Sequence, residues 1–152
     1  MKFELKAGKY LVIDPCYCVP DEDWSDLCAC FEYVGFKKQK GNCSSLTPVD
    51  QREGLEMFYK GQRFVVIGTA HGDGGFSLKQ SGRHIAELSV DAGLLSVIPL
   101  ELAQSWPEFN EKNDLGAIIE VKYNTTLTAN GGDFKFGQFS VKTGDEDNEE
   151  IS

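Results

Sequence analysis

Residues 10–24, "YLVIDPCYCVPDEDW", join a strand to a helix through a short polar turn. The run "YLVID" is apolar and ends at Asp14-Pro15, where the proline holds the preceding residue extended, so we predict a buried strand. Pro20 suits a first helical turn, and the acidic residues after it favour a helix N-terminus. Apolar side chains then recur at helical spacing, at Trp24, Leu27, Cys28 and Phe31. This periodicity predicts a helix over residues 20–34.

Strand signals dominate the rest of the chain. Apolar or alternating runs, separated mostly by tight turns, lie at residues 2–6, 56–59, 63–70, 76–80, 84–90, 94–98, 117–123, 125–129 and 133–141. Residues 37–54 are polar and predict a long loop, and residues 100–106 predict a helical turn or two. Because no strand–helix–strand alternation is visible, we predict an α+β fold. Its form is a mainly antiparallel curled sheet or open β-barrel with one principal and one short helix.

Length and charge predict one domain with an acidic tail. The chain has 152 residues, of which 41% are hydrophobic and 26% charged, and we assign residues 1–143 to a single globular domain. Residues 144–152 carry five acidic side chains, and without them the net charge of −9 becomes −4. We therefore expect an acidic, disordered tail. A phosphate-binding face must be basic, so direct nucleic-acid binding is disfavoured.

The sequence carries no membrane or export signal. No window approaches the roughly 18 apolar residues of a membrane span. The N-terminal stretch "MKFELKAGKYLVIDP" has scattered charges and no apolar core, unlike a signal peptide. The number of cysteines is five, an odd number, so we expect reduced thiols and a cytoplasmic protein rather than a disulfide framework.

The cysteines suggest two kinds of site, a zinc site or a nucleophile. Structural zinc sites usually separate paired cysteines by two to four residues, whereas Cys16 and Cys18, like Cys28 and Cys30, are separated by one. In a helix, positions i and i+2 lie about 200° apart, so the second pair cannot face one ion. We favour thiols that pack as small hydrophobes, and expect no metal site.

A nucleophilic Cys16 would need a histidine base, and the chain offers His71 and His84. His71 lies in the turn "TAHGDGGF", which suits a reactive base better than the start of a strand. No local signature of a cysteine hydrolase surrounds Cys16, however, and the glycines around Asp73 match no nucleotide-binding motif. Asp73-Gly74 and Asp91-Ala92-Gly93 are adequately explained as turns.

Three segments resemble a group of uncharacterised small bacterial and bacteriophage proteins. The matching positions are Asp14–Tyr17, Gly72–Gly74, and Val90–Gly93 with Ile98-Pro99. The resemblance brings no established activity with it. It implies that three loops, each with an aspartate, lie at one end of the sheet and line one site. The candidate ligand-binding residues are Asp14, Cys16, Tyr17, Trp24, His71, Asp73 and Asp91.

The leading hypothesis is a non-enzymatic, phage-type accessory protein that binds a host protein or a small nucleotide-like ligand, in the host cytoplasm. Counter-defence is one concrete version of it, by sequestering a nucleotide signal or inhibiting an effector. No catalytic residue or cofactor is assigned, and exposed strand edges would permit a dimer without specifying one. One alternative is a metal- or cysteine-dependent hydrolase that uses the Asp/Cys/His cluster. The other is an acidic mimic of nucleic acid.

Overall fold

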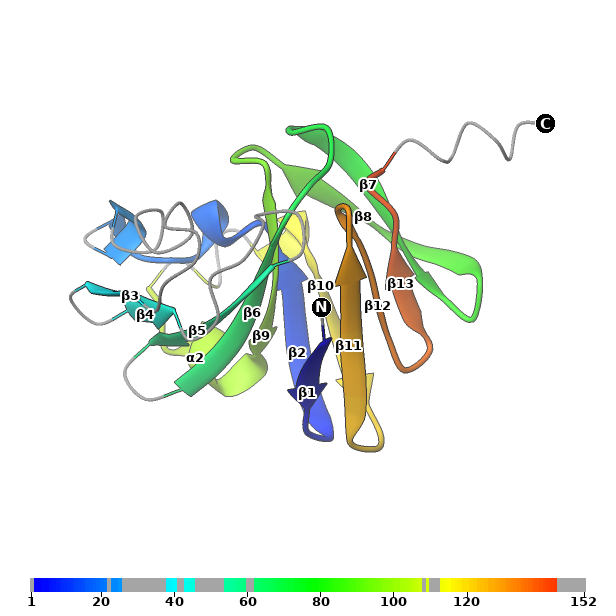
Figure 1. The fold of residues 1–152 in the computed structure, drawn as a ribbon, viewed down its shortest axis with the longest axis horizontal. Coiled ribbons are helices and arrows are strands. Elements are labelled where there is room, and N and C mark those ends of the chain that lie inside the picture. Colours follow the sequence, from blue (N-terminus) through cyan, green and yellow to red (C-terminus); the bar gives the residue numbers. More distant parts are fainter. Residues whose placement is uncertain are drawn as a thin grey trace.

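The computed structural model describes residues 2–21, 23–25, 38–40, 43–45, 54–59, 62–107, 109 and 113–144. These form two antiparallel sheets (Figure 1). The six-stranded sheet has the order β1 (Lys2–Leu5), β11 (Thr125–Asn130), β12 (Asp133–Phe136), β13 (Phe139–Val141), β7 (Gly74–Gln80) and β8 (Arg83–Val90). The seven-stranded sheet has the order β10 (Ala117–Val121), β2 (Gly8–Ile13), β9 (Leu94–Pro99), β6 (Gln62–Gly68), β5 (Leu55–Tyr59), β4 (Cys43–Ser45) and β3 (Lys38–Lys40).

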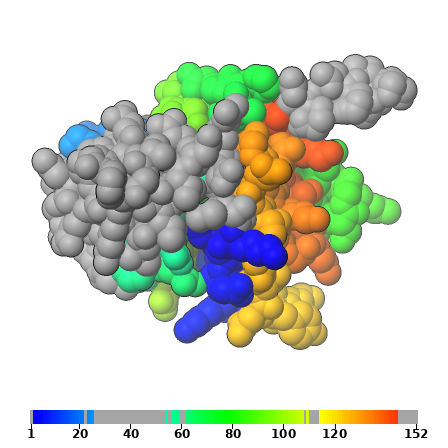
Figure 2. Space-filling model, viewed as in Figure 1, coloured from blue at the N-terminus to red at the C-terminus, as the bar shows by residue number. Residues whose placement is uncertain are grey.

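The main hydrophobic core lies between the two sheets. Strands of the six-stranded sheet contribute alternate side chains, such as Leu78, Leu127 and Phe136, which are at most 1% exposed. From the other sheet, Val12 and Val97 point into the same cluster. Figure 2 shows β1, in dark blue, against β11, in orange, as their antiparallel pairing requires. Alternation with a period of two residues therefore places the six-stranded sheet's apolar side chains on its inner face.

A second core covers the other face of the seven-stranded sheet. The β2 residues Leu11 and Ile13 point into it, on the face opposite Val12. Helix α2 (Leu100–Gln104) adds Leu102 and Ala103, and Trp106 packs edge-on against a β6 phenylalanine. Because both faces of the seven-stranded sheet are covered, β2 reads as a continuous apolar run rather than an alternating one.

The predicted fold class is confirmed: the described strands are antiparallel, the described helices are short, and the sheets do not close into a barrel. Two details differ. The predicted loop 37–54 contains the short strands β3 and β4, and the predicted strand 133–141 is two strands joined by a turn at Gly137. For the predicted helix 20–34, residues 21 and 23–25 are helical, and the remainder lies outside the described residues, as does most of the acidic tail.

Short helical segments join strands near the ends of the sheets. They are the 3-10 helices η1 (Pro15–Tyr17) and η2 (Asn113–Leu115). In the described part of the chain, no helix is long and apolar enough to cross a membrane.

Candidate functional site

Asp14 is the centre of the predicted site, and its side chain is fully buried. Oδ1 accepts a hydrogen bond of 2.9 Å from the Cys16 N–H, which caps η1. Oδ2 accepts bonds of 2.8 Å from the N–H groups of both Asp91 and Ala92. One carboxylate therefore joins the turn after β2 to the turn between β8 and β9, although the two turns are more than 70 residues apart in the sequence.

A third turn is attached to the second through Thr69, which is 8% exposed. Its N–H donates to the Gly93 carbonyl at 2.9 Å, and its Oγ1 donates to the Gly72 carbonyl at 2.6 Å. The three motif-bearing turns thus meet at one end of the molecule. We call this region the Asp14 end, made of residues 14–17, 69–73, 91–93, 131–132 and 143–144.

Thr143 connects the turn at residues 131–132 to the turn at residues 69–73. Its buried hydroxyl donates to the Gly132 carbonyl at 2.7 Å and accepts from the Ala70 N–H at 3.0 Å. Asp133 Oδ1 accepts from the N–H groups of Thr143 and Gly144. A buried polar group is stable where its hydrogen bonds are made, so these side chains hold the loops in one arrangement.

Cys16 is half-buried beside this network. Burial, followed by the negative charges of Asp14 and Asp91, raises the pKa of the Cys16 thiol well above its ordinary value. A cysteine nucleophile reacts as the thiolate, which forms where the pKa is lowered by a cation or a helix N-terminus. The surroundings of Cys16 do the reverse and keep the sulfur protonated at neutral pH.

Tyr17 lies where the Asp14 end meets the second core. It is half-buried against the second core, and burial together with nearby negative charge raises the pKa of its phenol. The neighbouring groups include Asp91 and Asp73, whose residues are both exposed. The structure therefore brings the three predicted aspartates and Tyr17 into one neighbourhood, with Asp14 buried and the other two at the surface.

The remaining predicted residues are less closely associated. His71 is exposed in the same turn as Asp73. His84 lies near the start of β8, and its Nδ1 is 2.5 Å from Ser77 Oγ. Six residues, or roughly 20 Å of strand, separate it from Val90 at the Asp14 end of β8. It cannot pair with Cys16. Trp24 is half-buried against the second core, so its predicted role as a wall of the site stays a prediction.

Metal ligation gains no support from the described residues, which contain no group of three or more His, Cys, Asp or Glu side chains suited to an ion. Cys18 is buried in the second core. Cys28 and Cys30, which the zinc interpretation also requires, lie outside the described part of the chain.

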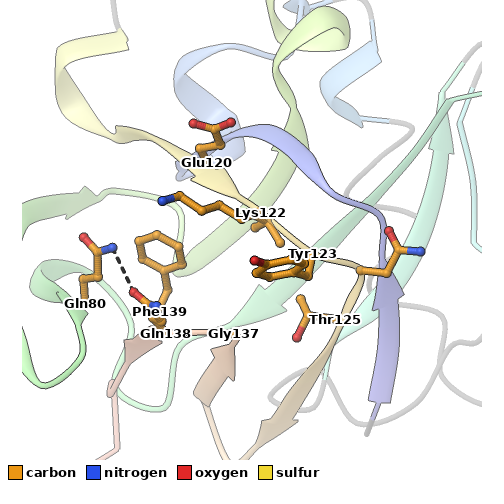
Figure 3. A pocket seen from close by; sticks show the side chains of 10 residues that line it. Gln80, Glu120, Lys122, Tyr123, Thr125, Gly137, Gln138 and Phe139 are labelled. Atoms are coloured by element: carbon orange, nitrogen blue, oxygen red, sulfur yellow. Dashed lines mark hydrogen bonds between the residues drawn. The ribbon is translucent and has the colours of Figure 1, made fainter.

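The opposite end of the molecule holds a cavity that the sequence did not reveal. We call it the Tyr123 pocket, and it has a volume of about 240 Å³ (Figure 3). Its walls come from the β10–β11 connection at residues 122–124 and the β12–β13 turn at Gly137-Gln138, with Gln80 at the end of β7. Tyr123 is 80% exposed and lies beyond the end of β10, whereas the sequence pattern predicted it at the end of a strand over residues 117–123, so no sequence signal indicated the cavity.

Comparisons with family models, curated proteins and solved structures find no significant match for this chain. What can be inferred about its function therefore comes from the geometry of these two ends.

Proposed function

We propose that this protein is a non-enzymatic binding protein that presents the Asp14 end to a protein partner. The proposal depends on one observation: the Asp14 carboxylate accepts three hydrogen bonds from backbone N–H groups. Such a group has a structural task and is buried away from any substrate. The described residues of the three converging turns contain no nucleophile–base pair, since the Ser77–His84 contact lies elsewhere in the six-stranded sheet, and this suits binding better than catalysis.

The chemistry of the exposed groups favours a partner with basic side chains. Asp73 and Asp91 stand near the half-buried Tyr17 and carry negative charge to the surface. Carboxylates beside an aromatic ring suit a lysine or arginine, which pairs with the acids and stacks on the ring. The same carboxylates repel phosphate, so a host protein is favoured over a nucleotide-like ligand as the partner.

The more specific version, a phage-encoded protein that blocks a defence effector in the host cytoplasm, rests on the resemblance of the three motifs. Of the alternatives, the cysteine hydrolase is disfavoured by the raised pKa of the Cys16 thiol. The acidic-mimic alternative assigns the interaction to the acidic tail, residues 144–152, together with other carboxylates. Deletion of residues 144–152 separates it from our proposal, which predicts unchanged binding.

The first experiment compares the intact mass of the purified protein under native and denaturing conditions, followed by a pull-down from bacterial lysate. We expect no bound small molecule and capture of a defined protein. Capture should be lost in the double variant Asp73→Asn/Asp91→Asn and retained in Tyr123→Ala, the matched control at the other end.

Two results would contradict the proposal. One is a native mass excess equal to a nucleotide, which would assign a small-ligand site. The other is hydrolysis of p-nitrophenyl acetate that Cys16→Ser abolishes, which would restore the enzyme.

A further inference from the structure

The Tyr123 pocket has an apolar base and an open rim. Val121 and Phe139 line it from the main core, with exposed fractions of 5% and 6%. At about 240 Å³ the cavity lies just below the roughly 300–1,000 Å³ of pockets for drug-sized molecules, so it suits a single small ring.

Tyr123 gives the pocket an exposed aromatic face on a fixed backbone. The connection at residues 122–124 is anchored because Asn124 Oδ1 accepts a 2.9 Å hydrogen bond from the Ala7 N–H. In Figure 3 the Lys122 side chain extends above the rings of Tyr123 and Phe139. A tyrosine side chain has only two torsions to restrict when it stacks, so on an anchored backbone it offers stacking area at a small entropic cost.

The polar side chains around the rings supply both donors and acceptors. Gln80 Nε2 donates to Gln138 Oε1 at 3.2 Å, which leaves Gln80 Oε1 as an acceptor and Gln138 Nε2 as a donor. Glu120 and Lys122 also line the cavity, and neither forms an ion pair with another residue in the described part of the chain. These four side chains therefore have hydrogen-bonding capacity to offer a ligand.

We propose that the Tyr123 pocket binds one ring of a neutral saccharide, at a site separate from the Asp14 end. A sugar ring has an apolar C–H face, which stacks on an aromatic ring, and hydroxyl groups that each donate and accept. The mixed set of amide, carboxylate and ammonium groups matches that hydroxyl pattern.

The charges in the pocket distinguish a sugar from a nucleotide. Among the described residues that line the cavity, Lys122 is the one cation and Glu120 the one anion, so their formal charges cancel and a phosphate gains no net attraction there. Glu120 is also the one carboxylic acid among the lining residues, and glycoside hydrolysis usually requires two. The site is therefore suited to holding a sugar rather than cleaving one.

The test is an amide-resolved NMR titration of the full chain with glucose, galactose, mannose and N-acetylglucosamine, each to about 20 mM. We expect at least one sugar to bind with a dissociation constant of about 1–10 mM. Signals from residues 120–125 and 137–139 and the side-chain amides of Gln80 and Gln138 should shift. Tyr123→Ala should weaken binding at least about tenfold, whereas Tyr123→Phe, which keeps the ring, should stay within about threefold.

Asp91→Asn serves as the control at the other end and should bind the sugar like the unmodified protein. The proposal is overturned if none of the four sugars shifts these signals, if Tyr123→Ala binds as well as the unmodified protein, or if adenosine monophosphate binds there and the sugars do not.

Discussion

At the Asp14 end, a buried carboxylate and two buried hydroxyls bond to backbone groups of neighbouring turns, whereas at the Tyr123 pocket polar side chains surround an open cavity. The first arrangement uses its hydrogen bonds to hold the fold. The second leaves hydrogen-bond donors and acceptors available to a ligand. A cluster of Asp, Cys and His in loops is thus no sign of catalysis by itself, because its polar atoms can be fully used within the protein.

The comparison is tested most severely by Asp14→Ala. The substitution leaves three partly buried N–H groups without their acceptor, each worth about 1–3 kcal/mol, so we expect the free energy of unfolding to fall by about 3–5 kcal/mol. Asp14→Asn keeps one acceptor oxygen, so its free energy of unfolding should fall by about half as much. Urea unfolding followed by tryptophan fluorescence measures both, and a loss below about 1 kcal/mol for Asp14→Ala would mean that the carboxylate does not hold the turns.

Two glycines, one at each end, sharpen the same contrast. A Cβ on Gly132 would lie 2.5 Å from Thr143 Oγ1 and 2.7 Å from the Ala70 nitrogen, whereas a Cβ on Gly137 meets nothing within 4 Å. Both have positive φ, +98° and +57°. We expect Gly132→Ala to lower the free energy of unfolding by about 2–4 kcal/mol. Gly137→Ala should lower it by about 1 kcal/mol, because its only penalty is the left-handed backbone conformation. Equal losses in thermal and urea unfolding would refute the difference in packing.

The pH dependence of stability reports on Cys16. Its folded pKa is raised, so the native state keeps a proton that the unfolded chain releases near its ordinary thiol value of 9.0. The contribution of Cys16 to stability should therefore be constant below that pH and fall as pH rises through it, by at most about 1.4 kcal/mol per pH unit. Unfolding in reducing buffer should show a shallower fall for Cys16→Ser. An unchanged slope would assign the effect to other groups, such as Tyr10 and Tyr17, whose pKa values are also raised.

The smallest expected effect belongs to Tyr123→Ala. The side chain is 80% exposed, so its removal should change the free energy of unfolding by no more than about 0.5 kcal/mol. A loss above about 1 kcal/mol in the urea experiment would show that Tyr123 supports the fold, and its effect on sugar binding would then lose its meaning.

The predictable part of the fold is the part with local signals. The Asp14-Pro15 break ends β2 as expected, because the proline and the capping aspartate act on their immediate neighbours. Strands β3 and β4 were missed because "KQK" and "CSS" carry no apolar alternation. The single predicted strand 133–141 hid a turn, since its glycine is one residue in an otherwise regular pattern.

The sites were harder to predict than the strands. The sequence indicated the three turns that contain aspartate. It did not indicate that the Asp14 carboxylate accepts hydrogen bonds from N–H groups 77 and 78 residues away, because those bonds depend on how the sheets pack. The Tyr123 pocket draws on residues near position 80, near 122 and near 138, which no sequence pattern links. Both sites are products of tertiary structure.

Native-state hydrogen exchange of the Asp91 and Ala92 amides tests the central claim most directly. Both residues are exposed in a turn between strands, where amides ordinarily exchange fast. If the Asp14 carboxylate holds them, their exchange should be slowed to rates close to those of β2, while the amides of Tyr123 and Gly137 exchange freely, and Asp14→Ala should remove the protection. Exchange of Asp91 and Ala92 as fast as that of Tyr123 would contradict the claim that Asp14 holds this end of the molecule together.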